Sequence, residues 1–191
     1  MVPRSPTVAR QRLFFALVPN EQTLSKIKKV QHWLRVRHGI DGRAVRADQF
    51  HVTLAFLGNQ PSSRLKTLLN LGAGLEMPVC RVLLDRLGIF QRAGILWLGT
   101  ATPPAELCAF QSRLVAALER ADIPFDRKPW KFHLTLYRDL RTPAVRIEPE
   151  TVGWDLNGFS LVESNSSVGG VEYRQLGRWP AGQVGIDCQT P

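Results

Sequence analysis

The chain has 191 residues, of which 44% are apolar and 21% are charged, and its formal net charge is +9. This composition supports a packed core and excludes a disordered polyelectrolyte, and no apolar run approaches the roughly 18 residues of a membrane span. The excess of Lys and Arg favours a polyanionic partner, with nucleic acid first, although charge alone does not decide the matter.

The ends of the chain and its cysteines indicate the domain boundaries and the cellular location that we expect. The basic N-terminal segment is not followed by the apolar stretch of a secretory signal, and we expect residues 1–11 to form a flexible lead-in. Residues 181–191 are expected to form a loosely ordered tail. Cys80, Cys108 and Cys188 have no paired spacing, which argues against a disulfide framework and for a reducing, cytoplasmic location. We therefore expect one monomeric domain over the whole chain, without a membrane segment.

The first part of the chain predicts strand, helix, strand and helix in that order. Residues 12–19 (RLFFALVP) form a short apolar run that stops at proline, which is typical of a buried strand. Asn20 then caps a helix that should end near Gly39. After a polar loop, a strand is expected over residues 51–57 and a second helix over residues 62–75.

The second part is richer in strands. Five are expected, at residues 81–90, 95–99, 131–137, 154–164 and 171–177. Residues 91–94 have the character of a hairpin bend, and the Gly169–Gly170 pair marks a turn between the last two strands. Thr102 and the two prolines after it predict the start of a third helix, whose apolar face extends to Leu118. Together, the predicted strands and helices indicate an α+β fold of mainly antiparallel sheet with helices on the outer faces.

Two of the expected strands carry the same pattern, His-x-Thr-Leu. His51 and Thr53 occur in FHVTLAFLG, and His133 and Thr135 occur 82 residues later in FHLTLYR. Side chains alternate along a strand, so each segment presents an imidazole and a hydroxyl on one face. The other face is apolar, and in the first segment alternation assigns Phe56 to it. A single strand histidine is usually structural, and it is the repetition that indicates function.

The remaining histidines have a simpler interpretation. His32 and His38 fall on the first predicted helix among Lys and Arg residues, and we interpret them as solvated surface.

The paired strands suit the chemistry of a phosphodiester. If the two parts of the chain pack as related lobes, the imidazoles can face each other across a groove. One neutral imidazole can then take a proton from water while the other, protonated, gives one to the leaving ribose oxygen. The threonine hydroxyls can donate hydrogen bonds to phosphate oxygens. A metal site would need three or four converging ligands, and neither strand supplies an alternating carboxylate. The sequence contains no glycine-rich phosphate-binding loop, so it gives no support for the use of ATP.

These motifs, together with RLFFALVP and the closing segment FSLVESNSSVGGVEYRQLGRWP, resemble those of the two-histidine phosphoesterase superfamily. The resemblance is to the bacterial RNA 2′,3′-cyclic phosphodiesterases, once called 2′-5′ RNA ligases, and it covers residues 12–180. It implies two pseudo-symmetric lobes around a central cleft. It also implies that an RNA 2′,3′-cyclic phosphate is hydrolysed to a 2′-phosphomonoester without metal or other cofactor.

The resemblance also implies a role for individual residues. His51 is similar to the general acid that protonates the 3′ oxygen, and His133 to the base that activates water. Thr53, Thr135 and Arg138 would hold the phosphate.

One expectation is in tension with strict alternation. Alternation places Lys131 and Tyr137 on the face of His133, and Arg138 on the opposite face. Both views hold if the strand ends or bulges near Tyr137. Tyr137 would then stack on a base or line the rim of the cleft. Relatives often have proline directly before the second histidine, where this chain has Phe132.

Two alternatives remain. The same cleft could run in reverse and join RNA ends weakly through a 2′-5′ bond. Alternatively, the chain could be a non-catalytic RNA-binding module that holds the backbone with basic loops at residues 43–46 and 127–131. The paired histidines argue against this second alternative, because binding alone would favour Arg or Lys.

Overall fold

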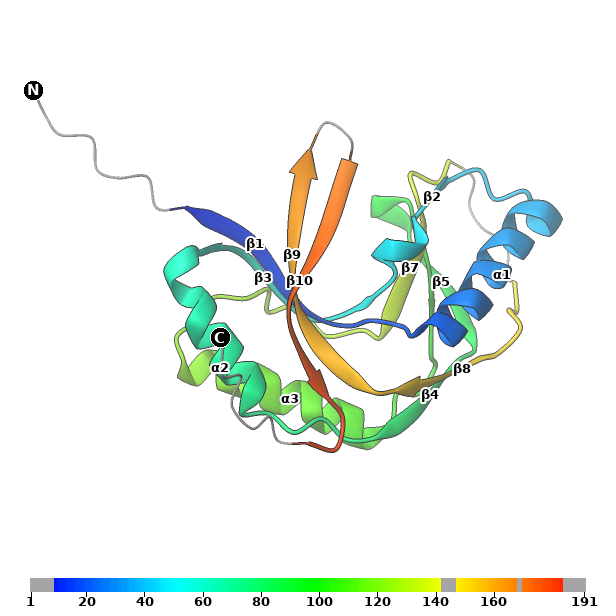
Figure 1. Ribbon diagram of the computed structural model, residues 1–191. Coiled ribbons are helices and arrows are strands. Elements are labelled where there is room, and N and C mark those ends of the chain that lie inside the picture. Colours follow the sequence, from blue (N-terminus) through cyan, green and yellow to red (C-terminus); the bar gives the residue numbers. More distant parts are fainter. Residues whose placement is uncertain (1–8, 142–146, 168–169, 184–191) are drawn as a thin grey trace, which may run out of the picture.

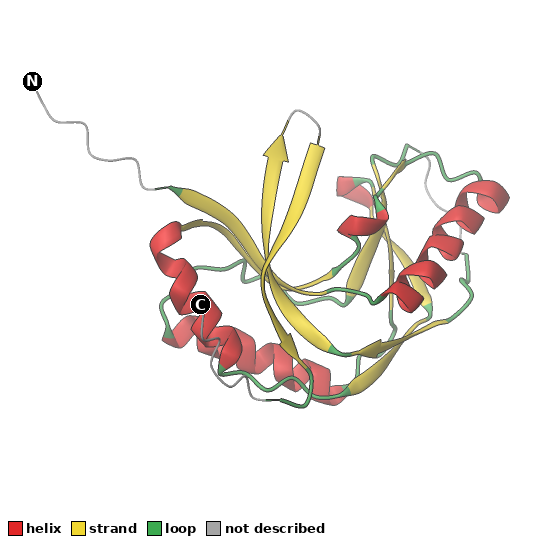
Figure 2. Ribbon diagram, in the orientation of Figure 1, coloured by secondary structure: helices red, strands yellow, loops and turns green. Residues whose placement is uncertain are grey.

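A computed structural model describes residues 9–141, 147–167 and 170–183 (Figure 1). Within these residues the chain forms an eight-stranded antiparallel sheet, a separate two-stranded sheet and three α-helices (Figure 2). The helices are α1 (Glu21–His38), α2 (Leu65–Ala73) and α3 (Ala105–Arg120). The strands of the large sheet are β1 (Arg10–Leu17), β2 (Arg43–Ala44), β3 (Val52–Pro61), β5 (Arg86–Phe90), β6 (Ile95–Gly99), β7 (His133–Arg138), β9 (Gly158–Ser167) and β10 (Gly170–Pro180).

The large sheet consists of two lobes that meet at one narrow joint. Its order is β10-β9-β1-β3-β7-β6-β5, and β2 also pairs with β7. Strands β1 and β3 are paired along their whole length, whereas β3 and β7 share only the pair Val52 and Leu134. We call β10-β9-β1-β3 the first lobe and the strands β7, β6, β5 and β2 the second lobe. The predicted α+β, two-lobed architecture is confirmed.

The lobes are not the two halves of the sequence. The first lobe combines β1 and β3 with the last two strands, so the chain leaves it after β3 and returns to it at β9. Helix α2 packs on β9 and β10, α3 packs on β3, and α1 packs against β8 (Val152–Leu156) of the small sheet. The small sheet pairs β8 with β4 (Cys80–Leu84).

The ends of the helices follow from their capping residues, with one correction. The Asn20 side chain accepts a hydrogen bond from the Thr23 N–H at 2.9 Å, and Gly39 ends α1 at a φ of 60°. Both predictions are confirmed. Helix α3 starts at Ala105, because Pro104 has an extended ψ of 138°. The prediction that Thr102 caps this helix is therefore wrong.

Two predicted strands are each divided in two. The stretch 81–90 changes sheets at Asp85, which separates β4 from β5. The stretch 154–164 is interrupted before Gly158, whose φ is 149°. A Cβ at Gly158 would lie 2.3 Å from the Trp179 carbonyl oxygen, so only glycine fits where β9 begins. The predicted hairpin at 91–94 is confirmed.

The predicted boundaries at the ends of the chain are tested only in part. Strand β1 begins at Arg10, so the predicted lead-in 1–11 extends two residues too far. Residues 1–8 and 184–191 of the predicted ends, and Gly169 of the predicted turn, lie outside the described residues.

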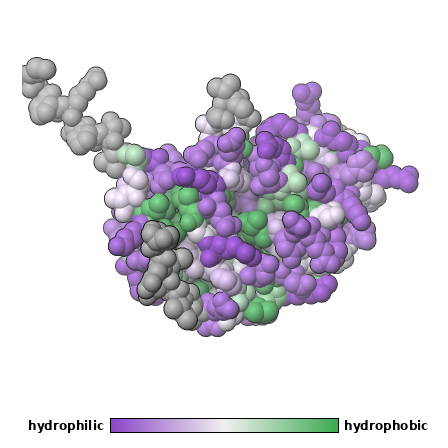
Figure 3. Space-filling view, viewed as in Figure 1, coloured by the Kyte–Doolittle hydropathy of each residue, from purple (hydrophilic) through white to green (hydrophobic). Residues whose placement is uncertain are grey.

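One apolar core runs beneath both lobes. Phe159 and Trp179 stack with ring centroids 4.9 Å apart, and Phe110 of α3 meets Phe159 at the same distance. Gly72 of α2 lies against the Trp179 ring, where a Cβ would come within 2.3 Å. The core thus docks α2 and α3 on the first lobe. The surface in Figure 3 is mostly hydrophilic with scattered apolar patches. No α-helix in the described ranges is long and apolar enough to cross a membrane.

Candidate active site

The joint between the lobes brings the two His-x-Thr segments together. Val52 and Leu134 are paired in antiparallel register. Extending this register by one residue in either direction places His51 across from Thr135, and Thr53 across from His133. Side chains directly opposite each other on antiparallel strands have Cβ atoms about 5 Å apart. The two imidazoles and two hydroxyls therefore form a square on one face, with the imidazoles on a diagonal. Val52 and Leu134 are buried on the other face.

Each imidazole is held by the same kind of backbone hydrogen bond. His51 Nδ1 lies 2.7 Å from the Gln49 carbonyl oxygen, and His133 Nδ1 lies 2.8 Å from the Lys131 carbonyl oxygen. A carbonyl oxygen only accepts, so Nδ1 donates in both cases and Nε2 is left for acid–base chemistry. In both segments the accepting carbonyl belongs to the residue two positions before the histidine. Phe132 packs between Trp130 and Trp154 and does not disturb this arrangement.

Both strands bulge three residues after the histidine. In β3, Thr53 pairs with Ala16 and Ala55 pairs with Phe15, which leaves Leu54 as the extra residue. In β7, Leu136 is the extra residue between partners on β6. A bulge reverses the faces of the residues that follow it. The fifth residue after each histidine therefore returns to the face of the imidazole.

Two glutamines hold the carbonyl groups of the bulges. Gln31 of α1 donates from Nε2 to the Leu136 carbonyl oxygen at 2.8 Å and also to the Val45 carbonyl oxygen at 2.9 Å. Gln111 of α3 donates from Nε2 to the Leu54 carbonyl oxygen at 3.2 Å. A bulge leaves backbone groups outside the regular ladder, and each helix supplies a donor for one of them.

The bulges settle the tension at the end of the second motif. Arg138 lies on the face of His133, where its charge acts on both imidazoles. Tyr137 lies in the core at 1% exposure, and its hydroxyl donates to the Gln31 carbonyl oxygen at 2.6 Å. The expectation that Tyr137 stacks on a base or lines the cleft is wrong. Phe56 is also displaced from its expected apolar face, and it packs with Phe14 on the cleft face.

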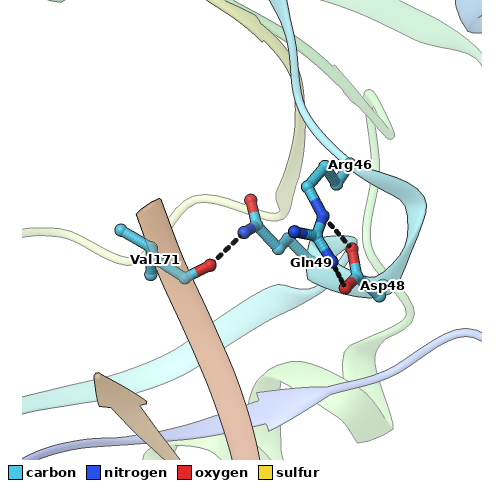
Figure 4. Close-up of polar contacts among 4 residues, drawn as sticks. All are labelled: Arg46, Asp48, Gln49 and Val171. Atoms are coloured by element: carbon cyan, nitrogen blue, oxygen red, sulfur yellow. Dashed lines mark hydrogen bonds and ion pairs between the residues drawn. The ribbon is translucent and has the colours of Figure 1, made fainter. Parts of the chain in front are cut away.

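His51 sits in an aromatic pocket that the motif itself does not reveal. The Phe14 and Tyr173 rings lie 4.9 and 5.2 Å from its imidazole, measured between centroids. Tyr173 belongs to β10, and a Tyr in the closing segment was the only signal for it in the sequence. The Gln49 side chain donates to the Val171 carbonyl oxygen of β10, beside the Arg46–Asp48 ion pair (Figure 4). Gln49 thus ties β10 to the backbone that orients His51.

His133 has a more open and more basic surrounding. The Phe90 ring meets its imidazole edge-on at 5.0 Å, and Trp97 lies 6.4 Å away. Lys131 Nζ lies 4.2 Å from the Trp97 ring centroid and 5.3 Å from that of Phe90, which holds this cation beside the imidazole.

The surroundings of both imidazoles favour their neutral forms. Burial lowers the pKa of His51 to about 4, and repulsion from His133 and Arg138 acts in the same direction. Burial also lowers the pKa of His133, with smaller contributions from Lys131 and Arg138. An anion bound between the imidazoles would favour their protonated forms and raise both pKa values. The cleft is therefore prepared for a negatively charged group.

A cavity of about 760 Å³ opens where β3 and β7 diverge. We call it the wedge cavity. Its lining includes His133 and Thr53 of the two motifs, Val115 of α3 and the segment 125–131. This segment bonds to the free edge of β3, through Trp130 Nε1 to the Thr53 carbonyl oxygen at 2.9 Å.

Metal-ligating side chains do not gather in the part of the chain that the structure describes. No group of three or more His, Cys, Asp or Glu residues lies close enough there to hold an ion. Cys80 and Cys108 are free thiols, and burial raises the pKa of Cys80 to about 11. His32 and His38 are exposed on α1, away from the joint.

Comparison with known proteins gives a consistent result. Residues 18–97 match the family model described as LigT like Phosphoesterase. The RNA 2′,3′-cyclic phosphodiesterase of Escherichia coli (strain K12) is 33% identical over 173 residues, covering 88% of this chain and 96% of that protein. The protein of the same name from Thermus thermophilus is 33% identical over 182 residues, covering 86% and 87%. The crystal structure of E. coli LigT complexed with 3′-AMP matches with a TM-score of 0.80 and 31% identity, over 92% of this chain and 100% of that one.

Proposed function

We propose that this chain, which belongs to the LigT-like phosphoesterase family, hydrolyses the 2′,3′-cyclic phosphate ends of RNA to 2′-phosphomonoesters. The observation that carries the proposal is the diagonal pair of imidazoles, each with Nδ1 bound to a carbonyl and Nε2 left for proton transfer. The curated relatives carry the name of this activity.

The reaction needs two proton transfers and one exchange of bonds. His133 Nε2 takes a proton from water, the water oxygen bonds to phosphorus, and the bond from phosphorus to O3′ breaks. His51 gives its proton to O3′. The products are a 2′-phosphate and a free 3′-hydroxyl. Each proton transfer contributes roughly 10²- to 10⁴-fold to the rate. The division of roles between the histidines follows the family likeness.

The remaining polar groups of the cleft serve the phosphate. Thr53 and Thr135 occupy the other corners of the square and donate to non-bridging oxygens. Arg138, on the same face, neutralises charge that grows in the transition state. A bound phosphate also raises the pKa of His51, which burial otherwise lowers, and this allows the histidine to act as an acid.

The test is an assay of chelator-treated protein on an RNA oligonucleotide that ends in a 2′,3′-cyclic phosphate. We expect hydrolysis that does not increase when zinc or magnesium is added. Phosphorus NMR should identify a 2′-phosphate. A 3′-phosphate would mean that the roles of His51 and His133 are reversed, and a requirement for a divalent ion would contradict the two-histidine mechanism.

We also infer that the enzyme is a cytoplasmic monomer that acts on RNA without ATP. The supporting observations are the thiols Cys80 and Cys108, the net charge of +9 and a hydrolysis that needs no energy input. Binding of longer RNA should weaken steeply with salt, because phosphate contacts release counterions. Sedimentation at several protein concentrations would test the oligomeric state.

A further inference from the structure

Helix α1 carries a large share of the positive charge of the chain. Its 18 residues include five Lys and Arg residues and one acidic residue, Glu21, so its net charge is +4 out of +9 for the whole chain. Helices α2 and α3 have no such excess, because α2 contains a single basic residue and the charges of α3 cancel. The charge is therefore concentrated on one helix and is not a property of the helices in general.

The cations of α1 are available to an external anion. All five are exposed, and they are Lys26, Lys28, Lys29, Arg35 and Arg37. None of the ion pairs among the described residues involves one of them. Arg35 instead donates to the Gly42 carbonyl oxygen at 2.8 Å. Lys26 and Lys29 lie one turn apart, where like charges destabilise a helix unless an anion compensates them.

The shape of α1 suits a long polyanion. One face of the helix is buried and packs toward β8, and its residues are Thr23, Ile27, Val30 and Leu34. The cations occupy the rest of the circumference. In Figure 1, α1 lies at the outer side of the second lobe, and the surface there is mostly hydrophilic in Figure 3. A helix of this length extends over about 27 Å, which is enough to face several phosphates of an RNA backbone.

Strand β2 connects the surface of α1 with the catalytic cleft. Arg35 is bonded to Gly42, the residue directly before β2. Arg43 of β2 is the register partner of Arg138 on β7. Residues directly opposite each other on antiparallel strands present their side chains on the same face, so Arg43 lies beside the cation of the cleft. Because Arg43 is itself paired with Asp139 at 2.9 Å, the unpaired cations of α1 supply the charge beyond it.

We propose that the exposed face of α1 is a second RNA-binding surface, which holds backbone phosphates of an RNA whose cyclic end lies in the cleft. The inference rests on the proposed function and extends recognition from the terminal phosphate to the body of the RNA. A chain of phosphates is complementary to a surface of exposed cations, and such contacts carry no sequence preference. The surface favours long RNA over short RNA through binding, and it leaves the chemical step unchanged.

The experiment compares two substrates that differ only in length. One is a diadenylate with a 2′,3′-cyclic phosphate, which is too short to extend beyond the cleft. The other is an oligoadenylate of about 20 nucleotides with the same end, which can reach α1. Lys28→Gln/Lys29→Gln removes two charges from α1 and keeps good helix formers there. The matched control, Lys66→Gln/Arg120→Gln, removes two charges from exposed positions of α2 and α3 that do not line the wedge cavity.

We expect Lys28→Gln/Lys29→Gln to raise KM for the long RNA at least about fivefold, while kcat stays within about twofold of wild type. Hydrolysis of the diadenylate should also stay within about twofold, which shows in addition that the variant is folded. The slope of log kcat/KM against log salt concentration for the long RNA should become shallower by about 1.4, because two phosphate contacts are lost. The control variant should change KM for the long RNA less than about twofold.

Three outcomes would overturn the inference. Equal increases of KM in the two double variants would assign the effect to net charge and not to α1. An unchanged KM in Lys28→Gln/Lys29→Gln would show that α1 does not contact the RNA. A parallel loss on both substrates would place the effect in the cleft or in the fold. A wild type that hydrolyses both substrates keeps the proposed function in any of these cases, whereas one that hydrolyses neither overturns the proposed function itself.

Discussion

The two histidine strands share a backbone design and differ in the side chains that the design presents. Each has a histidine whose Nδ1 donates to a carbonyl two residues earlier. In each, a bulge follows the threonine, and its carbonyl accepts from a glutamine of the helix packed nearby. The duplication therefore extends beyond the His-x-Thr letters to the irregular backbone that follows them.

The difference lies in the residue that each bulge returns to the cleft face. In the first strand it is Phe56, whose ring packs with Phe14 and has the Arg12 guanidinium 5.0 Å from its centroid. In the second strand it is Arg138. One lobe thus adds apolar surface to the cleft, and the other adds a cation.

This difference makes two equivalent backbone positions chemically unequal. Aromatic rings enclose His51, and one of them, Tyr173, belongs to β10. His133 instead lines the wedge cavity next to Lys131. A symmetric site would present two interchangeable imidazoles. An asymmetric one can reserve one imidazole for the leaving oxygen and the other for the attacking group.

The largest effect should come from the imidazoles themselves. His51→Ala and His133→Ala should each lower the rate of hydrolysis by at least about 10²-fold, because each removes one proton transfer. His32→Ala, an exposed histidine on α1, is the control. Circular dichroism should show intact secondary structure in all three. If either cleft variant kept more than about a tenth of the wild-type rate, the acid–base pair would be wrongly assigned.

The next effect tests the asymmetry directly. Arg138→Gln removes a charge-assisted contact worth about 1.5–3 kcal/mol and should lower kcat/KM about 10- to 100-fold. Phe56→Leu removes no charge and should cost less than about threefold. Because Arg138 lowers the pKa of both histidines, its removal should raise both values in an imidazole NMR titration. Equal losses of rate in the two variants would mean that the cleft uses both positions alike.

Much of this site could be predicted from the sequence, and the part that could not has a physical cause. Alternation correctly placed His51 with Thr53 and His133 with Thr135, because no bulge separates the members of either pair. For the residues after Leu54 and Leu136, alternation assigned the side chains to the wrong face of the strand. Leucine fits a regular strand and a bulge equally well, so nothing in the pattern marks the change of face.

The supports of the bulges were equally hidden. Gln31 lies 105 residues from the carbonyl it holds, and Gln111 lies 57 residues from its own. Such contacts are set by tertiary packing and leave no local signature. The family resemblance assigned Arg138 to the phosphate, whereas alternation placed Tyr137 on the cleft face. A sequence motif includes the residue that a bulge brings to the cleft, even though it does not show that a bulge is present.

The glutamines offer a matched pair of smaller perturbations. Gln31→Leu removes two donors and should disturb the bulge that presents Arg138, whereas Gln111→Leu removes one donor from the bulge that presents Phe56. Each hydrogen bond contributes about 0.5–1.5 kcal/mol. We expect Gln31→Leu to raise KM more than Gln111→Leu does and, because it removes two hydrogen bonds rather than one, to lower thermal stability more. A larger KM effect in Gln111→Leu would show that the Arg138 bulge is not the one that binds substrate.

The smallest effect concerns the charge beside the base. Lys131 lowers the pKa of His133, so Lys131→Met should raise it. A base must be neutral to accept a proton, and a higher pKa means that more of it is protonated at low pH. The acid limb of kcat/KM should therefore move to higher pH, most clearly at low ionic strength, where the charge is least screened. Lys128→Met, which removes a cation paired with Asp126 in the same segment, is the control and should leave the limb in place. An acid limb that stays fixed in Lys131→Met would show that it does not report the ionisation of His133.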